Sequence, residues 1–65
     1  MAATRQQKTY RVRYTVMYDG LSPKREVEVM ANTLREARSV AALKIYRLEP
    51  EADDFIIQGN PELIV

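Results

Sequence analysis

Residues 9–18 alternate strictly between two kinds of side chain, and this pattern constrains the fold more than any other part of the chain. Every second residue is apolar or aromatic, and these residues share one face of an extended segment: Tyr10, Val12, Tyr14, Val16 and Tyr18. The other face carries Thr9, Arg11, Arg13, Thr15 and Met17. A period of two is typical of a β-strand with one buried side. The segment therefore predicts a strand whose tyrosines and valines form part of the core.

A second strand is predicted after a turn. Asp19-Gly20 is a hairpin signal, because glycine takes up positive φ without steric cost. Residues 25–31 then alternate again, with valine and alanine on the side that matches the apolar face of the first strand. On the opposite side, arginines lie across from or diagonal to glutamates, and each such pair favours strand pairing by about 0.2 to 1 kcal/mol. These four residues are Arg11, Arg13, Glu26 and Glu28.

A helix is predicted to begin after Thr33. Residues 33–36 match the capping box, in which the Thr33 hydroxyl accepts from the Glu36 amide and the Glu36 carboxylate accepts from the Thr33 amide. At about 100° per residue, one apolar stripe of this helix is predicted to lie on the tyrosine and valine face of the hairpin. The stripe consists of Leu34, Ala37, Ala41, Ile45 and Leu48. Pro50 ends the helix, since the residue before a proline is disfavoured in the α region.

The last part of the chain predicts one further strand and a short apolar stub. Residues 55–58 are too short and too apolar for anything but a strand, and residues 59–61 predict a turn into residues 62–65. The layout is β-β-α-β, which is an α+β fold with an antiparallel three- or four-stranded sheet and one helix packed on one face. A right-handed crossover places the third strand beside the first and antiparallel to it, with the other edge as the alternative.

The length of 65 residues predicts a single domain. We expect a flexible basic arm over residues 1–8 and one β-β-α-β domain over residues 9–65. No apolar run reaches the about 20 residues of a membrane span, and residues 1–8 lack the hydrophobic segment of a secretory signal. The expected location is therefore cytoplasmic, with no membrane partner.

The chain contains no cysteine and no histidine. This excludes a thiolate nucleophile, the usual zinc ligands and the side chain best suited to acid–base catalysis near neutral pH. We do not expect an enzyme, because the remaining carboxylates, lysines and tyrosines would need large pKa shifts from an interior that a domain of this size hardly has. The acidic stretch 49–54 lacks the glycine and the ligand spacing of a calcium loop, so neither a metal nor a cofactor is expected.

Two groups of exposed apolar residues are predicted, because one helix covers only one face of a small sheet. The predicted protein-binding residues are Arg35, Leu43, Tyr46 and Arg47 on the helix and Met17, Met30 and Ile56 on the sheet. Tyrosine and arginine around an apolar patch are typical of interfaces. The pattern favours a small non-enzymatic protein-binding module that occupies a surface of a larger protein or complex, or a homodimer. One alternative is that the helix residues only shield the edge of a small core and that residues 63–65 fold back over the open sheet face. Another is a subunit that adds its open sheet edge to the sheet of a larger complex.

A second hypothesis is nucleic-acid binding through the basic arm and the first strand. Its candidate residues are Arg5, Lys8, Arg11 and Arg13. A net charge of +1 does not favour this function, and the alternation places the tyrosines with the valines in the core, where they cannot stack on bases.

The arrangement of a charged hairpin, Tyr10-Arg11-Val12 to Glu26-Val27-Glu28-Val29, and a capped helix beginning at Asn32-Thr33 resembles that of many small phage or mobile-element proteins, including some anti-CRISPR proteins. It is also similar to the hairpin–helix unit of an archaeal ribosomal protein family. The resemblance covers about residues 9–48 and implies an inhibitor or accessory role of the phage type. No functional residue follows from it, because a shared layout does not transfer a site.

Overall fold

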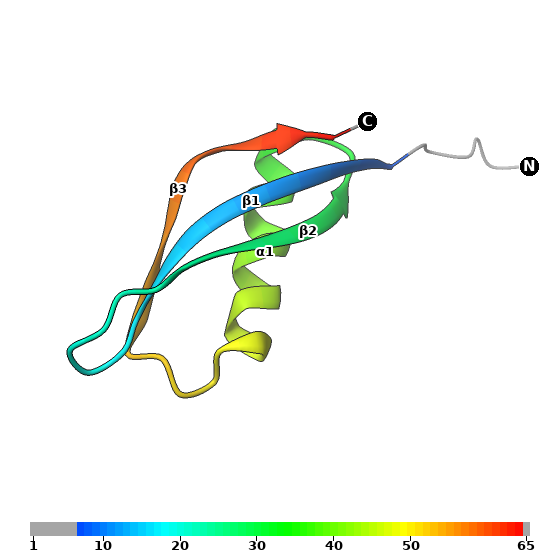
Figure 1. Ribbon diagram of the computed structural model, residues 1–65. Coiled ribbons are helices and arrows are strands. Elements are labelled where there is room, and N and C mark those ends of the chain that lie inside the picture. Colours follow the sequence, from blue (N-terminus) through cyan, green and yellow to red (C-terminus); the bar gives the residue numbers. More distant parts are fainter. Residues whose placement is uncertain (1–6, 65) are drawn as a thin grey trace, which may run out of the picture.

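The computed structural model describes residues 7–64 as a three-stranded antiparallel sheet and one helix, a small α+β fold (Figure 1). The elements are β1 (Lys8–Met17), β2 (Lys24–Ala31), α1 (Leu34–Leu48) and β3 (Asp54–Leu63). The strand order is β2-β1-β3, and β1 is antiparallel to both neighbours. The predicted position of the third strand beside the first is therefore confirmed. The predicted arm falls largely on residues 1–6, which lie outside the described residues.

The β1–β2 hairpin pairs the apolar faces of the two strands, as predicted, and the structure defines its register. Val12 pairs with Val27, and Arg11 and Arg13 pair with Glu28 and Glu26. The chain reverses at Asp19-Gly20, where Gly20 has a φ of 77° and the backbone groups of Tyr18 and Leu21 bond each other at 2.8 and 3.0 Å. Positive φ at this turn is the reason for glycine at that position.

The core combines the tyrosine and valine face of the sheet with three helix residues. The buried cluster contains Tyr10, Val12, Tyr14, Val16, Val27, Val29, Ala31, Ala37, Ala41 and Ile45. In Figure 1 the helix runs behind the sheet. The prediction that Leu34 and Leu48 complete the buried stripe is wrong, since they are 47% and 52% exposed. They are the first and last residues of α1, so the stripe is buried only along the middle of the helix.

The helix begins as predicted, with one difference in its cap. Thr33 Oγ1 accepts from the Glu36 amide at 3.1 Å, as expected of an N-cap threonine. The Glu36 carboxylate, however, accepts from the amide of Asn32 at 2.6 Å rather than from that of Thr33. The helix ends at Leu48, with Glu49 as its C-cap directly before Pro50.

The predicted turn at residues 59–61 is instead a bulge within β3, and no separate fourth strand forms in the described residues. Gln58 pairs with Arg13 and Glu62 pairs with Arg11, so three residues of β3 stand opposite Val12 alone. Gly59 has a φ of 64°, and a glycine at positive φ allows the strand to bend and then rejoin the ladder. Ile64 continues the pairing by donating to the carbonyl of Thr9 at 2.8 Å.

Candidate functional site

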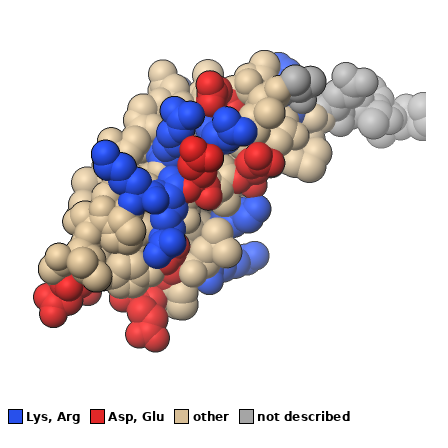
Figure 2. All heavy atoms as spheres, in the orientation of Figure 1, with Lys and Arg blue, Asp and Glu red and all other residues tan. Residues whose placement is uncertain are grey.

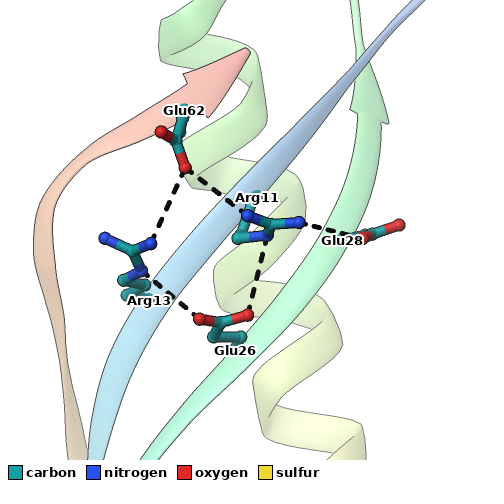
Figure 3. Close-up of polar contacts among 5 residues, drawn as sticks. All are labelled: Arg11, Arg13, Glu26, Glu28 and Glu62. Atoms are coloured by element: carbon teal, nitrogen blue, oxygen red, sulfur yellow. Dashed lines mark hydrogen bonds and ion pairs between the residues drawn. The ribbon is translucent and has the colours of Figure 1, made fainter. Parts of the chain in front are cut away.

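An ionic cluster of two arginines and three glutamates occupies the centre of the open sheet face, the face away from the core (Figure 3). Arg11 contacts all three carboxylates, at 3.6 Å (Glu26), 4.0 Å (Glu28) and 3.8 Å (Glu62). Arg13 contacts Glu26 at 3.4 Å and Glu62 at 3.8 Å. The β2 glutamates follow from the hairpin pattern, but Glu62 was not predicted because the bulge brings it into register.

This cluster bears directly on the nucleic-acid hypothesis. Its two arginines and three glutamates sum to −1, so the positive charges of Arg11 and Arg13 are already balanced. Figure 2 shows basic and acidic groups interleaved over this part of the surface. Lys8 is exposed at the start of β1, and Arg5 lies outside the described residues. The arrangement does not present an unbroken basic surface to a phosphate backbone.

The predicted binding residues of the sheet do not form one patch. Met30 is 57% exposed and pairs with Thr9, whereas Ile56 is 49% exposed and pairs with Thr15. At about 3.3 Å per residue, these two positions lie roughly 20 Å apart along the sheet, with the ionic cluster between them. Met17 is half-buried at the Ile56 end.

The predicted binding residues of the helix do share one side of α1. At about 100° per residue, Arg35, Leu43, Tyr46 and Arg47 fall within an arc of about 120° opposite the buried residues. We call these four residues the outer helix surface. Leu43 is 64% and Tyr46 is 70% exposed. The Tyr46 ring also packs edge-on against Phe55 at a centroid distance of 5.5 Å, so it shields the core edge as well.

The structure thus divides the predicted protein-binding set between opposite sides of the molecule. The open sheet face carries Met17, Met30 and Ile56, and α1 lies against the other face of the sheet. No single flat partner surface can contact both sets at once.

A second polar group, which was not predicted, surrounds Glu49 at the end of α1. Its carboxylate lies 3.0 Å from Arg25 Nε and accepts from the hydroxyls of Tyr14, at 3.5 Å, and Tyr18. The Glu49 side chain is only 11% exposed. A carboxylate that is largely shielded from water at a helix C-terminus is unfavourable unless it is paired, and these three partners supply the pairing. The sequence signal that could have predicted this group is the placement of Tyr14 and Tyr18 on the core face of the first strand, since tyrosine hydroxyls in or near a core need an acceptor.

The Glu49 carboxylate also affects the two tyrosines. Burial is the main cause that raises the pKa of Tyr14, followed by the nearby negative charge of Glu49. The hydrogen bond to Glu49 is the main cause that raises the pKa of Tyr18. Both shifts favour neutral hydroxyls, which donate to the carboxylate and connect β1 and the residue that follows it to the end of the helix.

A surface groove of about 620 Å³ lies beside the ionic cluster, lined by Arg13, Tyr14, Lys24, Arg25, Glu26 and Gln58. Its volume is within the range of small-ligand sites. Two of its three cations are already paired with carboxylates, Arg13 with Glu26 and Arg25 with Glu49. The groove therefore has only Lys24 as a cation without an ion pair among residues 7–64, and we assign no ligand to it.

Within residues 7–64, we find no group of three or more acidic side chains placed to hold a metal ion. In the same part of the chain, α1 is neither long enough nor apolar enough to cross a membrane.

Comparisons with known proteins do not assign this chain to a family. No protein-family model, no curated protein and no solved structure matches it significantly. The resemblance to phage and mobile-element proteins therefore stays a prediction, and the candidate function rests on the chemistry of the surfaces alone.

Proposed function

We propose that the chain is a small non-enzymatic protein-binding module that attaches to a larger protein or complex through the outer helix surface. The observation that carries this proposal is the exposure of two large apolar side chains, Leu43 (64%) and Tyr46 (70%), between two arginines on one side of α1. Exposed tyrosine and arginine around apolar surface are enriched where proteins bind one another.

The charge arrangement supports the helix over the sheet as the binding surface. Arg11 and Arg13 on the sheet are held by glutamates, whereas Arg35 and Arg47 have no ion pair among residues 7–64. Arg35 also lies in the first turn of α1, where a positive charge opposes the helix dipole. Its presence is therefore not explained by helix stability, and a carboxylate on a partner would give it a role.

The partner that fits this surface has an apolar groove with carboxylates on its rim. A helix binds such a groove through side chains spaced three and four residues apart, and Leu43, Tyr46 and Arg47 have this spacing. Leu43 and Tyr46 would enter the groove, and the two arginines would pair with the rim.

The test is affinity capture from a lysate of the cells that encode the chain, quantified by mass spectrometry. A Leu43→Glu/Arg47→Glu variant should lower the yield of the bound partner by about 10-fold or more, because central interface residues carry most of the binding energy. Leu21→Glu is the matched control, since Leu21 is 67% exposed but lies at the hairpin turn. Equal capture by all three proteins would overturn the proposed surface.

Fluorescence anisotropy with labelled single-stranded and duplex DNA and RNA, at about 50 and about 200 mM salt, tests the nucleic-acid hypothesis. Binding that weakens steeply with salt and is lost in the Arg11→Glu/Arg13→Glu variant would replace protein binding as the proposed function. We expect no such binding, because glutamates already pair with both arginines.

A further inference from the structure

The outer edge of β3 differs from the rest of the surface because its backbone is open over a short apolar stretch. The carbonyls of Met17 and Thr9 accept from the amides of Asp53 and Ile64. The backbone N–H and C=O groups of the odd-numbered residues of β1 therefore point toward β3. Thr15 pairs with Ile56, so the backbone groups of Ile56 point toward β1. Since backbone groups alternate in direction, those of Phe55 and Ile57 point out of the sheet.

Two polar contacts limit this opening at either end. The Phe55 amide donates to its neighbour's carboxylate, Asp54 Oδ1, at 2.8 Å. The Gly59 carbonyl accepts from Arg38 Nη1 at 2.9 Å. Between these contacts, the amide and carbonyl of Ile57 have no hydrogen-bond partner among residues 7–64. Edge strands with free backbone groups and apolar side chains are templates for pairing with another strand.

The sequence of this edge is complementary to itself. When a second copy is paired antiparallel about a two-fold axis at Ile56, Phe55 of each copy lies opposite Ile57 of the other. Ile56 then lies opposite Ile56, and Asp54 lies opposite Gln58, so no like charges meet. Each Phe55–Ile57 pair exchanges two backbone hydrogen bonds, provided that the Phe55 amide leaves Asp54 for the carbonyl of the second copy.

Two registers shifted toward the bulge fit less well. An axis at Ile57 places Phe55 opposite Gly59, whose carbonyl Arg38 already occupies. An axis at Gln58 places Asp54 opposite Glu62, and like charges directly opposite are destabilising.

The other edge of the sheet is unsuited to the same pairing. On β2 the outward-facing stretch contains Glu26 and Glu28, and any two-fold axis between these residues sets glutamates opposite one another. The Glu28 carbonyl is also occupied, since it accepts from Lys44 Nζ at 2.9 Å.

We propose that two copies of this chain pair through β3, antiparallel about a two-fold axis at Ile56, to form a continuous six-stranded sheet. The interface is isologous, with the same residues contributed by both copies. The Tyr46 ring, which packs on Phe55, lies at the boundary between the copies. This assembly goes beyond the proposed function, because it uses a strand edge and needs no other protein.

The test is sedimentation velocity on the full chain from about 5 to 500 μM. A strand-pair interface is small, and we expect a dissociation constant on the order of 10 to 100 μM. Ile56→Lys places two ammonium groups at the axis and should raise this constant by on the order of 100-fold. Met30→Lys is the matched control, because Met30 is similarly exposed on the same sheet face but belongs to β2. It should change the constant by less than about twofold.

A second pair of variants tests the register and does not depend on Ile56→Lys remaining folded. Gln58→Lys sets a lysine opposite Asp54 twice in the dimer and should tighten it by about 3- to 10-fold, while Gln58→Glu should weaken it by a similar factor. A monomer at all concentrations, an equal response to Ile56→Lys and Met30→Lys, or the reverse order of the Gln58 variants would overturn the proposal. None of these results affects the capture test, which uses Leu43, Arg47 and Leu21.

Discussion

The two edge strands of the sheet, β2 and β3, differ in how well the helix covers them and in the residues along their outer edges. On β2 the residues that face the core are buried, with Val27 at 6% and Val29 at 4% exposure, whereas on β3 Phe55 and Ile57 are only half-buried. The helix contacts β2 more extensively than β3. The outer edge of β2 carries glutamates, whereas the outer edge of β3 is apolar over residues 55–57. A single helix thus buries the core-facing side chains of one edge strand almost completely and those of the other edge strand only in part.

The two edges share one kind of contact, in which a basic side chain of α1 donates to a backbone carbonyl that points out of the sheet. Lys44 donates to Glu28 of β2 at 2.9 Å, and Arg38 donates to Gly59 of β3 at 2.9 Å. On β2 this contact adds to a charged strand. On β3 it protects only the bulge and leaves Ile57 open. The difference between the edges therefore lies mainly in the strand sequences and in how far the helix reaches.

The largest expected effect comes from truncating matched core-facing residues on the two edges. Val29→Ala should lower the free energy of unfolding by about 2 to 3 kcal/mol, because it removes buried methyl groups and leaves a cavity. Ile57→Ala removes more atoms but should cost less, about 1 kcal/mol, since its side chain is only half-buried. Urea denaturation at low protein concentration measures both. A cost for Ile57→Ala equal to or above that of Val29→Ala would contradict the comparison.

The part of the fold that is most local in sequence was predictable. The pairing of β1 and β2 through their apolar faces followed from alternation, which also placed Arg11 and Arg13 across from or diagonal to the β2 glutamates. The capped start of α1 and its end before Pro50 followed from residues close in the chain. These signals are strong because each depends on a few neighbouring side chains and a regular period.

The bulge and the Glu49 group were not predictable in the same way. Gly59-Asn60-Pro61 looks like a turn locally, and only pairing with β1 on both sides makes it a bulge. Glu49 looks like part of an exposed acidic stretch, and its partners include the hydroxyls of Tyr14 and Tyr18, which lie more than 30 residues earlier in the chain. For the candidate site, the outer helix surface followed from helical periodicity, whereas the separation of Met30 from Ile56 required the register of β3.

A smaller effect is expected from the group that ties the β2 side to the helix end. Glu49→Ala removes the acceptor for two tyrosine hydroxyls and the partner of Arg25, and it should lower the free energy of unfolding by about 1 to 2 kcal/mol. Glu51→Ala is the control, because Glu51 is exposed in the following loop. Thermal or urea unfolding of both variants provides the measurement. An equal loss of unfolding free energy in the two variants would contradict the inference that Glu49 connects the sheet to the end of the helix.

The smallest expected effect is a loss of stability at alkaline pH that reports on the same link. The folded state raises the pKa of Tyr14, mainly through burial, and of Tyr18, mainly through its bond to Glu49. Above about pH 10 the unfolded chain ionises these tyrosines first, so it binds fewer protons than the folded chain and stability falls as pH rises. Below that pH the contribution is fully present.

Urea unfolding between about pH 8 and pH 11 should therefore give a flat stability followed by a decline, and the decline should be shallower in Tyr14→Phe/Tyr18→Phe. Tyr46→Phe is the control for the loss of an exposed hydroxyl elsewhere, and its decline should match that of the parent chain. An identical decline in the double variant would mean that the hydroxyl bonds to Glu49 do not depend on pH as inferred. The end of the helix would then be held mainly by the ion pair of Glu49 with Arg25 of β2 and by apolar packing, without a contribution from the tyrosine hydroxyls.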